Sequence, residues 1–377
     1  MVNKKRLVKT LQRLISLDSQ NPPGDEREIA AFVGKYLQAR GLKIRTYAFS
    51  NKRVNVLATL PGRKHLKSLL LTPHLDTVPA GDSWKTPALK AKIIGNRIYG
   101  LGTTDCKGNL ASALEAISAI VEDGVKLDYD LIFAATADEE SGSALGLIPL
   151  LEQKLLKADV AVVLDADDFE IVITQKGLMH LAVRISGKKA HGAYPWLGVN
   201  AINLATKIII DLENQHQNCV KNKYLRAPTI NVGTIKGGDK VNVVSDWCEF
   251  ELDFRFLPGS TEKEILRSLR ETITKYTRNY KIKIQGIQAP YYIDPGHPLV
   301  SSLVSAMQSL GIKPRISGSE GATVITFFKA MNIPAIATGF GTEGCAHIAD
   351  EYASLDNLYR GAQVLVAFLK KYRFSQS

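Results

Sequence analysis

Four short apolar segments constrain the fold of this 377-residue chain more than any other feature. They are residues 68–72, 130–136, 159–164 and 333–338. Their apolar residues do not alternate with polar ones, which is typical of parallel strands that are covered on both faces. The chain is therefore predicted to have an α/β fold, with a mostly parallel sheet and helices on both faces of it.

Each of these segments is followed by polar residues that can bind cations. The residues concerned are His74 and Asp76, then Asp138, Glu139 and Glu140, then Asp165, and finally His347. Ligands of open α/β sheets bind beyond the carboxyl ends of the strands, so residues far apart in sequence can converge there. Carboxylates and imidazoles are costly to gather in one buried place unless a cation lies among them. The pattern predicts a metal site.

The local sequence suggests a task for several of these residues. In the segment His74-Leu75-Asp76, the histidine can bind a metal while the aspartate orients its ring. Asp105 follows a glycine-rich turn and precedes a predicted helix over 109–121, where its two oxygens could hold two cations. Glu139 and Glu140 are adjacent, so their side chains point in different directions. One could bind metal while the other transfers protons.

Seven segments occur in an order that matches a known family. They are PHLDTVPAG (73–81), GLGTTDCKG (100–108), ADEESGS (137–143), LDAD (164–167), AHGAYP (190–195), VNVVSDWCEFELDFR (241–255) and GTEGCAHIADEY (341–352). In these segments the chain resembles the dinuclear zinc metallohydrolases. This family includes acetylornithine deacetylase, succinyl-diaminopimelate desuccinylase, aminoacylase and glutamate carboxypeptidase. The likeness spans nearly the whole chain.

The resemblance implies a zinc-peptidase-like catalytic domain with two divalent metal ions. Zinc is expected, although cobalt or manganese would suit the same nitrogen and oxygen ligands. The implied ligands are His74 and Asp165 for one ion and Glu140 and His347 for the other, with Asp105 bridging. Glu139 falls at the general base, and Asp76 supports His74. The family also implies a cis peptide bond between Asp105 and Cys106.

The middle of the chain has a different pattern. Predicted strands over 178–186, 229–235, 248–256 and 281–284 alternate with helices over 200–212 and 262–278, which is the ferredoxin-like order. Thr261 and Glu264 form a capping box at the second helix. The expected domains are therefore 1–176 with 287–377 for catalysis and 177–286 as an insert. The resemblance implies that this insert is a lid and the interface of a homodimer.

Three polar residues of the insert match positions that the family uses. The resemblance implies that His191 reaches a carbonyl oxygen in the active site, often that of the partner subunit. Asn242 and Arg255 would hold a substrate carboxylate, which an arginine fork binds with two hydrogen bonds. The chain departs from the family at 318–323, where Gly-Ser-Glu-Gly-Ala-Thr replaces Gly-Gly-Thr-Asp-Ala-Arg. Glu320 could instead favour a basic substrate.

These observations predict a hydrolase that cleaves the amide bond of an N-acyl amino acid or a small peptide with a free carboxylate. A metal-bound water would attack the carbonyl, with Glu139 as general base. A dipeptidase or carboxypeptidase of the same family is an alternative. A further alternative is a non-catalytic protein that keeps the same fold. Such a protein would be expected to lose its metal ligands, but here all five ligand positions and the base carry the expected residues.

The net charge of +11 raises the competing hypothesis of a basic protein that binds nucleic acid or an anionic surface. Its lysines and arginines are scattered, however, and no nucleic-acid motif is recognisable, so no nucleic-acid partner is predicted. The amino terminus does not have the pattern of a secretory signal, and no apolar run is long enough to cross a membrane. A cytoplasmic protein without a membrane partner is expected.

Other polar residues near the motifs have ordinary interpretations. Asp138 is expected to accept a structural hydrogen bond, and Asp167 and Asp168 to be solvated turn residues. The remaining histidines are expected to lie at the surface or in packing positions; they are His65, His180, His216 and His297.

Overall fold

A computed structural model describes residues 1–214, 222–321 and 323–374 of the chain. His216 lies outside the described residues. The chain forms two compact units. The first consists of Met1–Ile173, Ile293–Ser317 and Phe327–Ser377, and the second of Thr174–Tyr292 and Gly318–Thr326. The second unit thus includes two short segments beyond residue 286 that sequence reasoning did not place in the insert, one ending at Tyr292 and the other Gly318–Thr326.

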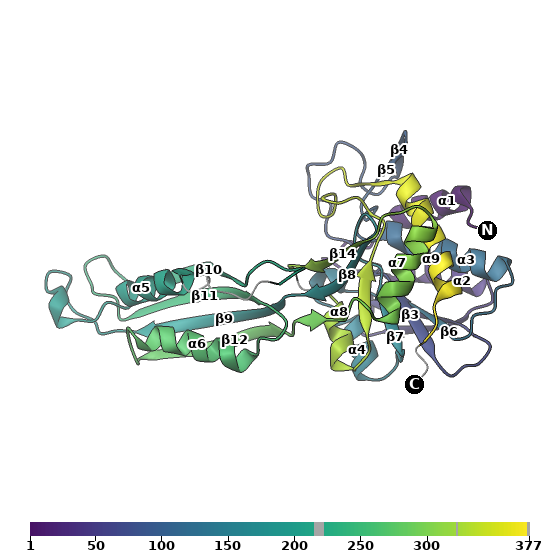
Figure 1. The fold of residues 1–377 in the computed structure, drawn as a ribbon. Coiled ribbons are helices and arrows are strands. Elements are labelled where there is room, and N and C mark those ends of the chain that lie inside the picture. The colour runs from purple at the N-terminus through teal and green to yellow at the C-terminus, as the bar shows by residue number, and fades with distance from the viewer. Residues whose placement is uncertain (215–221, 322, 375–377) are drawn as a thin grey trace. The chain divides into compact units, whose positions relative to one another are not determined.

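The largest sheet in the described part of the chain has nine strands (Figure 1). Its order is β1 (Lys43–Ala48), β2 (Val54–Leu60), β6 (Asp130–Ala135), β3 (Ser68–Thr72), β7 (Val160–Val163), β15 (Ala335–Thr338), β8 (Glu170–Gln175) and β13 (Tyr291–Tyr292), with β14 (Arg315–Ser319) also paired to β8. The pairs β6–β3, β3–β7 and β7–β15 are parallel. The outer pairs β1–β2, β2–β6, β15–β8 and β13–β8 are antiparallel. The sheet is therefore mixed, and its parallel part consists of the four apolar segments.

The predicted α/β fold is confirmed, and burial explains why these segments were recognisable. Leu69, Leu70 and Leu71 of β3 are all fully buried, although consecutive side chains of a strand point to opposite faces. A strand with both faces covered has no polar side to alternate with. The central strands therefore carry the core of the first unit.

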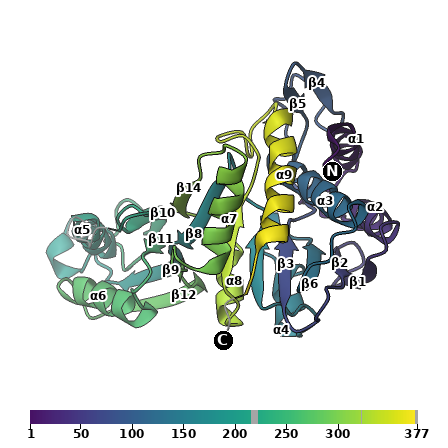
Figure 2. The same ribbon diagram turned by 45° about the vertical axis from the view of Figure 1, so that its right-hand side comes forward.

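Seven helices accompany this sheet in the described residues. They are α1 (Lys4–Ile15), α2 (Arg27–Gln38), α3 (Lys107–Glu122), α4 (Leu147–Glu152), α7 (Pro298–Ser309), α8 (Ile325–Ala330) and α9 (Leu355–Lys371). Helix α3 contacts both α1 and α9, and its residues from Lys107 to Ile120 are all buried. Its alanines, serines and leucines suit a helix enclosed on all sides. Figure 2 shows α7 and α9 side by side along the sheet, and the two helices are in contact.

A small three-stranded sheet completes the first unit, with the order β16 (Tyr352–Ser354), β5 (Arg97–Tyr99) and β4 (Lys92–Ile94). The pairing of Tyr352 with Tyr99 fixes the chain just beyond His347. This pairing also brings Glu351 next to the glycine-rich turn, because the backbone N–H of Gly100 donates to the carbonyl of Glu351.

The second unit has the predicted ferredoxin-like order. Its elements are β9 (Gly177–Ser186), α5 (Ala201–Asn214), β10 (Thr229–Gly237), β11 (Trp247–Phe256), α6 (Glu262–Thr274) and β12 (Tyr280–Gln288). The strands lie in the order β10–β11–β9–β12 and are antiparallel throughout. The capping box of Thr261 and Glu264 is present. The unit has its own core, in which Phe250 and Val183 are fully buried.

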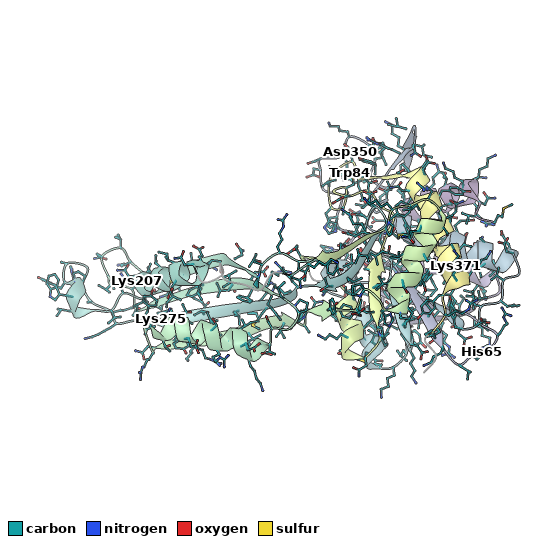
Figure 3. All side chains as sticks on the ribbon, viewed as in Figure 1. His65, Trp84, Lys207, Lys275, Asp350 and Lys371 are labelled. Atoms are coloured by element: carbon teal, nitrogen blue, oxygen red, sulfur yellow. The ribbon has the colours of Figure 1, made fainter. Side chains whose placement is uncertain are left out.

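Basic side chains lie on both units, as Lys207 and Lys275 of the second unit and Lys371 of the first illustrate in Figure 3. The positive charge of the chain is therefore not confined to one of them. Among the described residues, no helix has both the length and the apolar character that crossing a bilayer requires.

Candidate metal centre

The ends of the parallel strands bring the candidate ligands together. His74 lies just beyond β3 and pairs with Thr136 beyond β6 in an isolated parallel bridge. Asp165 follows β7, and the loop after β15 contains His347. Because β6, β3, β7 and β15 are adjacent and parallel, their carboxyl ends lie along one edge of the sheet. All of these residues belong to the first unit.

One group of donor atoms surrounds the imidazole of His74. Its Nε2 atom lies 2.8 Å from Oδ1 of Asp105 and 3.8 Å from Oδ1 of Asp165. Donor atoms of His74, Glu139 and Asp165 all lie within 4.8 Å of one another. The side chain of His74 is only 2% exposed, whereas Glu139 and Asp165 are half-buried, so the imidazole is the most enclosed part of this group.

A second group surrounds His347. Its Nε2 atom lies 3.0 Å from Oδ2 of Asp105 and 3.1 Å from Oε2 of Glu140. Donor atoms of Asp105, Glu140 and His347 also lie within 4.8 Å of one another. Asp105 therefore directs one carboxylate oxygen to each histidine, and His347, with 51% of its side chain exposed, is on the open side of the site.

The donor set fits two divalent cations. Each group offers one imidazole nitrogen together with carboxylate oxygens, which are ligands that zinc, cobalt and manganese accept. Hydrogen bonds with Asp105 and Glu140 raise the pKa of His347 to about 10. Burial alone would raise the pKa of Asp105, but hydrogen bonds with His347 and His74 outweigh it and hold that pKa below its usual range. The raised pKa of His347 reflects the negative charge of the carboxylates around it, an excess that cations would neutralise.

The same excess acts on Glu139 and Asp165. Burial and the nearby Asp165 raise the pKa of Glu139 well above its ordinary value. Burial and the charge of Asp105 raise the pKa of Asp165 to about 7. A raised pKa means that a carboxyl group binds a proton more readily, which favours the proton transfers of a general base.

Asp76 belongs to neither donor group. Its oxygens accept the backbone N–H groups of Glu139 and Glu140, each at 3.1 Å. The Nδ1 atom of His74 lies 2.9 Å from the backbone oxygen of Asp76 and 3.6 Å from its carboxylate. Asp76 thus ties the histidine to the turn that carries both glutamates, a link that sequence reasoning did not find.

Glu351 holds the loop of Asp105 through hydrogen bonds to its backbone. Its carboxylate accepts the backbone N–H groups of Gly102 at 2.7 Å, Thr104 at 2.7 Å and Asp105 at 3.0 Å. Glu351 is only 2% exposed and was not among the predicted site residues. The peptide bond between Asp105 and Cys106 is cis, as the family resemblance implied.

Two of the acidic residues with ordinary interpretations have clear partners. Asp138 accepts hydrogen bonds from Arg53 at 2.6 Å and from the backbone N–H of Leu145 at 2.8 Å, in agreement with a structural role. Asp168 is half-buried rather than solvated. It accepts the backbone N–H of Glu343 and the side-chain amide of Asn357, which fixes the loop that leads to His347.

The predicted substrate residues His191, Asn242 and Arg255 all belong to the second unit. The segments of His191 and Asn242 are adjacent, since the backbone N–H of Gly192 donates to the carbonyl of Asn242. The guanidinium of Arg255 donates to both carboxylate oxygens of Asp253, at 2.7 and 2.9 Å. The functional roles of all three stay predictions.

The hypothesis that Glu320 selects a basic substrate is not supported by its surroundings. Its carboxylate lies 2.6 Å from Nζ of the buried Lys176 and accepts the backbone N–H of Arg226. Thr323, at the position of the family's arginine, hydrogen-bonds to Gln175. The charge of Glu320 is therefore already compensated within the second unit.

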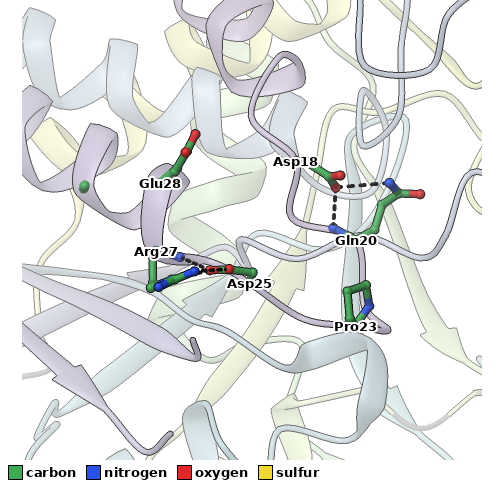
Figure 4. A pocket seen from close by; sticks show the side chains of 7 residues that line it. Asp18, Gln20, Pro23, Asp25, Arg27 and Glu28 are labelled. Carbon is green, nitrogen blue, oxygen red and sulfur yellow. Dashed lines mark hydrogen bonds and ion pairs between the residues drawn. The ribbon is translucent and has the colours of Figure 1, made fainter. Parts of the chain in front are cut away.

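A surface cavity of about 620 Å³ lies over the segment before α2 (Figure 4). It is lined by Asp18, Gln20, Pro23, Asp25, Arg27, Glu28 and Ala31. Arg27 donates to Asp25, and Gln20 donates to Asp18, as the dashed lines in Figure 4 indicate. The cavity contains none of the candidate metal ligands.

Comparison with known proteins supports the same interpretation. A family model described as peptidase family M20/M25/M40 matches residues 70–371. An acetylornithine deacetylase of Pectobacterium atrosepticum is 33% identical over 311 residues, covering 80% of this chain and 78% of that protein. The solved structure of a Staphylococcus aureus tripeptidase has a TM-score of 0.79 and 25% identity, covering 98% of both chains. A dinuclear metal-binding peptidase of Bacillus subtilis, 17% identical over 97% of both chains, has the same fold with a TM-score of 0.77.

Proposed function

Because the chain belongs to the peptidase family M20/M25/M40, we propose that it hydrolyses the amide bond of an N-acyl amino acid or small peptide with a free carboxylate. The chain is a metal-dependent hydrolase of that family, and the substrate class is the part proposed. The 33% identity with an acetylornithine deacetylase over 80% of the chain supports a deacylase.

The observation that carries the proposal is the position of Asp105 between the two donor groups. One of its oxygens lies 2.8 Å from His74 and the other 3.0 Å from His347. This arrangement suits a carboxylate shared by two cations. We assign His74 and Asp165 to one cation and Glu140 and His347 to the other, with zinc as the proposed native metal.

The residues around the cations have distinct proposed tasks. When bound, the two cations would lower the pKa of a water and polarise the scissile carbonyl. Glu139 accepts a proton from the attacking water and delivers it to the departing amine, because its carboxylate lies beside His74 and Asp165 and is assigned to neither cation. Asp76 holds the backbone of Glu139 in place during these steps.

The second unit supplies the proposed substrate contacts. His191 would donate to the carbonyl oxygen as negative charge develops on it, and Asn242 and Arg255 would bind the substrate carboxylate. Arg255 is paired with Asp253, so a substrate would share or replace that partner. The outer strands β10 and β12 expose Ile235, Ile284 and Ile287, which supports a homodimer formed through this unit. Light scattering of the purified protein tests the dimer.

Cleavage of short peptides is the second candidate. The likeness to a tripeptidase over 98% of both chains favours it. The family's arginine is replaced by Thr323, whose hydroxyl donates to Gln175, so one expected substrate contact is missing for either candidate.

A substrate panel separates the candidates. Metal-reconstituted protein is assayed with N-acetyl and N-succinyl amino acids, dipeptides and tripeptides, beside the Glu139→Ala variant. We expect the highest kcat/KM with an N-acyl amino acid and no turnover by the variant. A clear preference for tripeptides would establish the second candidate instead, and wild-type turnover by Glu139→Ala would exclude Glu139 as the base.

A further inference from the structure

Two residues of the segment Asn21–Pro22–Pro23–Gly24–Asp25–Glu26, namely Gly24 and Glu26, lie against the guanidinium of Arg53. Gly24 has a positive φ of 75°, and a Cβ atom at this position would lie only 1.2 Å from Nη1 of Arg53. The guanidinium thus occupies the space that any side chain at position 24 would need. Arg53 itself is only 5% exposed.

Three buried carboxylates share the charge of Arg53. Its Nη2 atom donates to Oδ1 of Asp138 at 2.6 Å and lies 4.0 Å from Oδ2 of Asp76. Its Nη1 atom lies 3.2 Å from Oε1 of Glu26. Glu26 and Asp76 are fully buried, and Asp138 is 6% exposed. Neither oxygen of Glu26 has a hydrogen-bond donor in the described part of the chain, and Arg53 is its ion-pair partner.

Two of these carboxylates hold the turn that carries Glu139 and Glu140. Asp76 accepts the backbone N–H groups of both glutamates. Asp138 directly precedes them, has a left-handed φ of 66°, and accepts the backbone N–H of Leu145 at the far side of the turn. The side-chain amide of Asn21 donates to Oδ2 of Asp76 at 2.9 Å and so connects the segment before α2 to this carboxylate. Arg53 is therefore one contact away from the backbone of the proposed base.

Electrostatics makes this arrangement depend on the arginine. Asp76 also lies 3.6 Å from His74, whereas Asp138 has its close ion pair with Arg53, at 2.6 Å. Removing the arginine would leave Asp138 as a buried charge without that partner, which is costly. A carboxylate that loses its ion-pair partner in a buried place is expected to move towards other donors or solvent. Since Asp138 directly precedes Glu139 and is hydrogen-bonded across the turn, such a movement would displace Glu139 and Glu140.

We propose that Arg53, which lies against Gly24 and Glu26, is a positioning residue that sets the orientation of the Glu139–Glu140 turn. The proposal rests on the proposed function, in which Glu139 is the base and Glu140 binds a cation. It assigns the Asn21–Glu26 segment to the active site through Arg53, although no residue of that segment belongs to either donor group.

The test compares two variants. Arg53→Met removes the guanidinium, whereas Gly24→Ala keeps the arginine but displaces its guanidinium from the position beside residue 24. Zinc and cobalt affinities are measured by calorimetric titration of the metal-free full-length protein, and kcat and KM are measured with the best substrate of the panel. All measurements are made well below the Tm of each variant. The metal titration needs no substrate, so it remains informative even if the substrate proposal fails.

We expect both variants to bind one of the two cations at least about tenfold more weakly and to lose at least about tenfold in kcat, with a smaller change in KM. Arg53→Lys should restore part of the loss, because its single ammonium group can still pair with Asp138. Arg6→Met is the matched control, since Arg6 also pairs with a buried carboxylate, Glu115, at 2.7 Å. It should lower Tm without changing metal affinity or kcat.

The proposal is overturned if Arg53→Met and Gly24→Ala lower only Tm and leave metal affinity and kcat at the level of Arg6→Met. If Arg53→Met does not fold, Arg53→Lys and Gly24→Ala decide the question by the same comparison. Unchanged metal affinity and kcat in those two variants would also overturn it.

Discussion

Glu351 accepts a hydrogen bond from the backbone N–H of Asp105 at 3.0 Å. The same carboxylate accepts the N–H groups of Gly102 and Thr104, so three donors of one loop converge on one buried side chain. Because Glu351 follows His347 by four residues, it connects the loops of two proposed ligands that are more than two hundred residues apart in sequence. The geometry of the bridging carboxylate thus depends on a residue that binds no metal.

The first prediction concerns this contact. Glu351→Gln keeps the shape of the side chain but turns one acceptor into an NH₂ group that faces backbone donors. We expect a loss of about 10- to 100-fold in kcat or metal affinity, and a lower free energy of unfolding by about 1–3 kcal/mol. Steady-state kinetics and urea denaturation measure the two effects. Wild-type kinetics in this variant would mean that the loop keeps its position without Glu351.

The second prediction separates the base from the ligands. Glu139→Gln cannot take up a proton, so kcat should fall by about 10²- to 10⁴-fold while KM and metal affinity change little. Glu152→Gln, at the exposed end of α4, is the control and should behave as wild type. A variant Glu139→Gln that loses its metals would place this residue among the ligands, as its proximity to His74 and Asp165 would also allow.

The third prediction concerns metal removal. Chelation should abolish activity and lower Tm, because the carboxylates of the site are left uncompensated. Adding back a cation at about 100 times its Kd should restore about 2.7 kcal/mol for each independent site. Scanning calorimetry with zinc, cobalt and manganese measures the shift. Asp105→Asn should respond far less to any of the three, and an equal response would show that the cations bind elsewhere.

The fourth prediction is a pH dependence of stability that arises at His297. This residue is the N-cap of α7, and its Nδ1 accepts the backbone N–H of Leu299. Burial lowers the pKa of His297 below its ordinary value of 6.5. The unfolded chain therefore takes up a proton at a higher pH than the native state does, and the free energy of unfolding falls as pH drops from 6.5 towards the native pKa.

The variant His297→Asn isolates this effect. Asparagine keeps a capping oxygen and does not titrate, so the variant should lose less stability than wild type between about pH 7.5 and about pH 5. Urea unfolding at both pH values measures the difference. Identical losses in the two proteins would contradict the assignment to His297.

The fifth prediction concerns the core of the second unit. Phe250 lies on β11 and is fully buried in this core, so Phe250→Ala should lower the free energy of unfolding by about 3–5 kcal/mol. Trp247 lies on the same strand and provides a fluorescence signal for the transition. Glu249→Ala, on the exposed side of that strand, is the control and should have little effect.

The central strands and the candidate ligands could be predicted from sequence for one physical reason. A strand buried on both faces is recognisable by its composition, and its carboxyl end fixes where the next polar residues lie. By contrast, β1 and β2 are antiparallel outer strands that depend on pairing with distant residues. Sequence reasoning did not identify them, nor β8, which carries the chain from one unit into the other.

The supporting residues of the site could not be predicted in the same way. Arg53 acts on Asp138, and Glu351 acts on backbone N–H groups of residues 102–105, so neither pair has a fixed spacing in sequence. His297 is a similar case, because histidine is not a typical N-cap residue. These contacts arise only when the sheet brings separate loops together.

The second unit begins at Thr174 and ends its main segment at Tyr292, and these two residues are paired with each other. On the other side of the boundary, the backbone N–H of Ile293 donates to the carbonyl of Ile173. A stretch of well over a hundred residues therefore leaves and returns to neighbouring positions. Such a stretch could have been acquired, exchanged or deleted as a whole during evolution while the order of the remaining strands stayed the same.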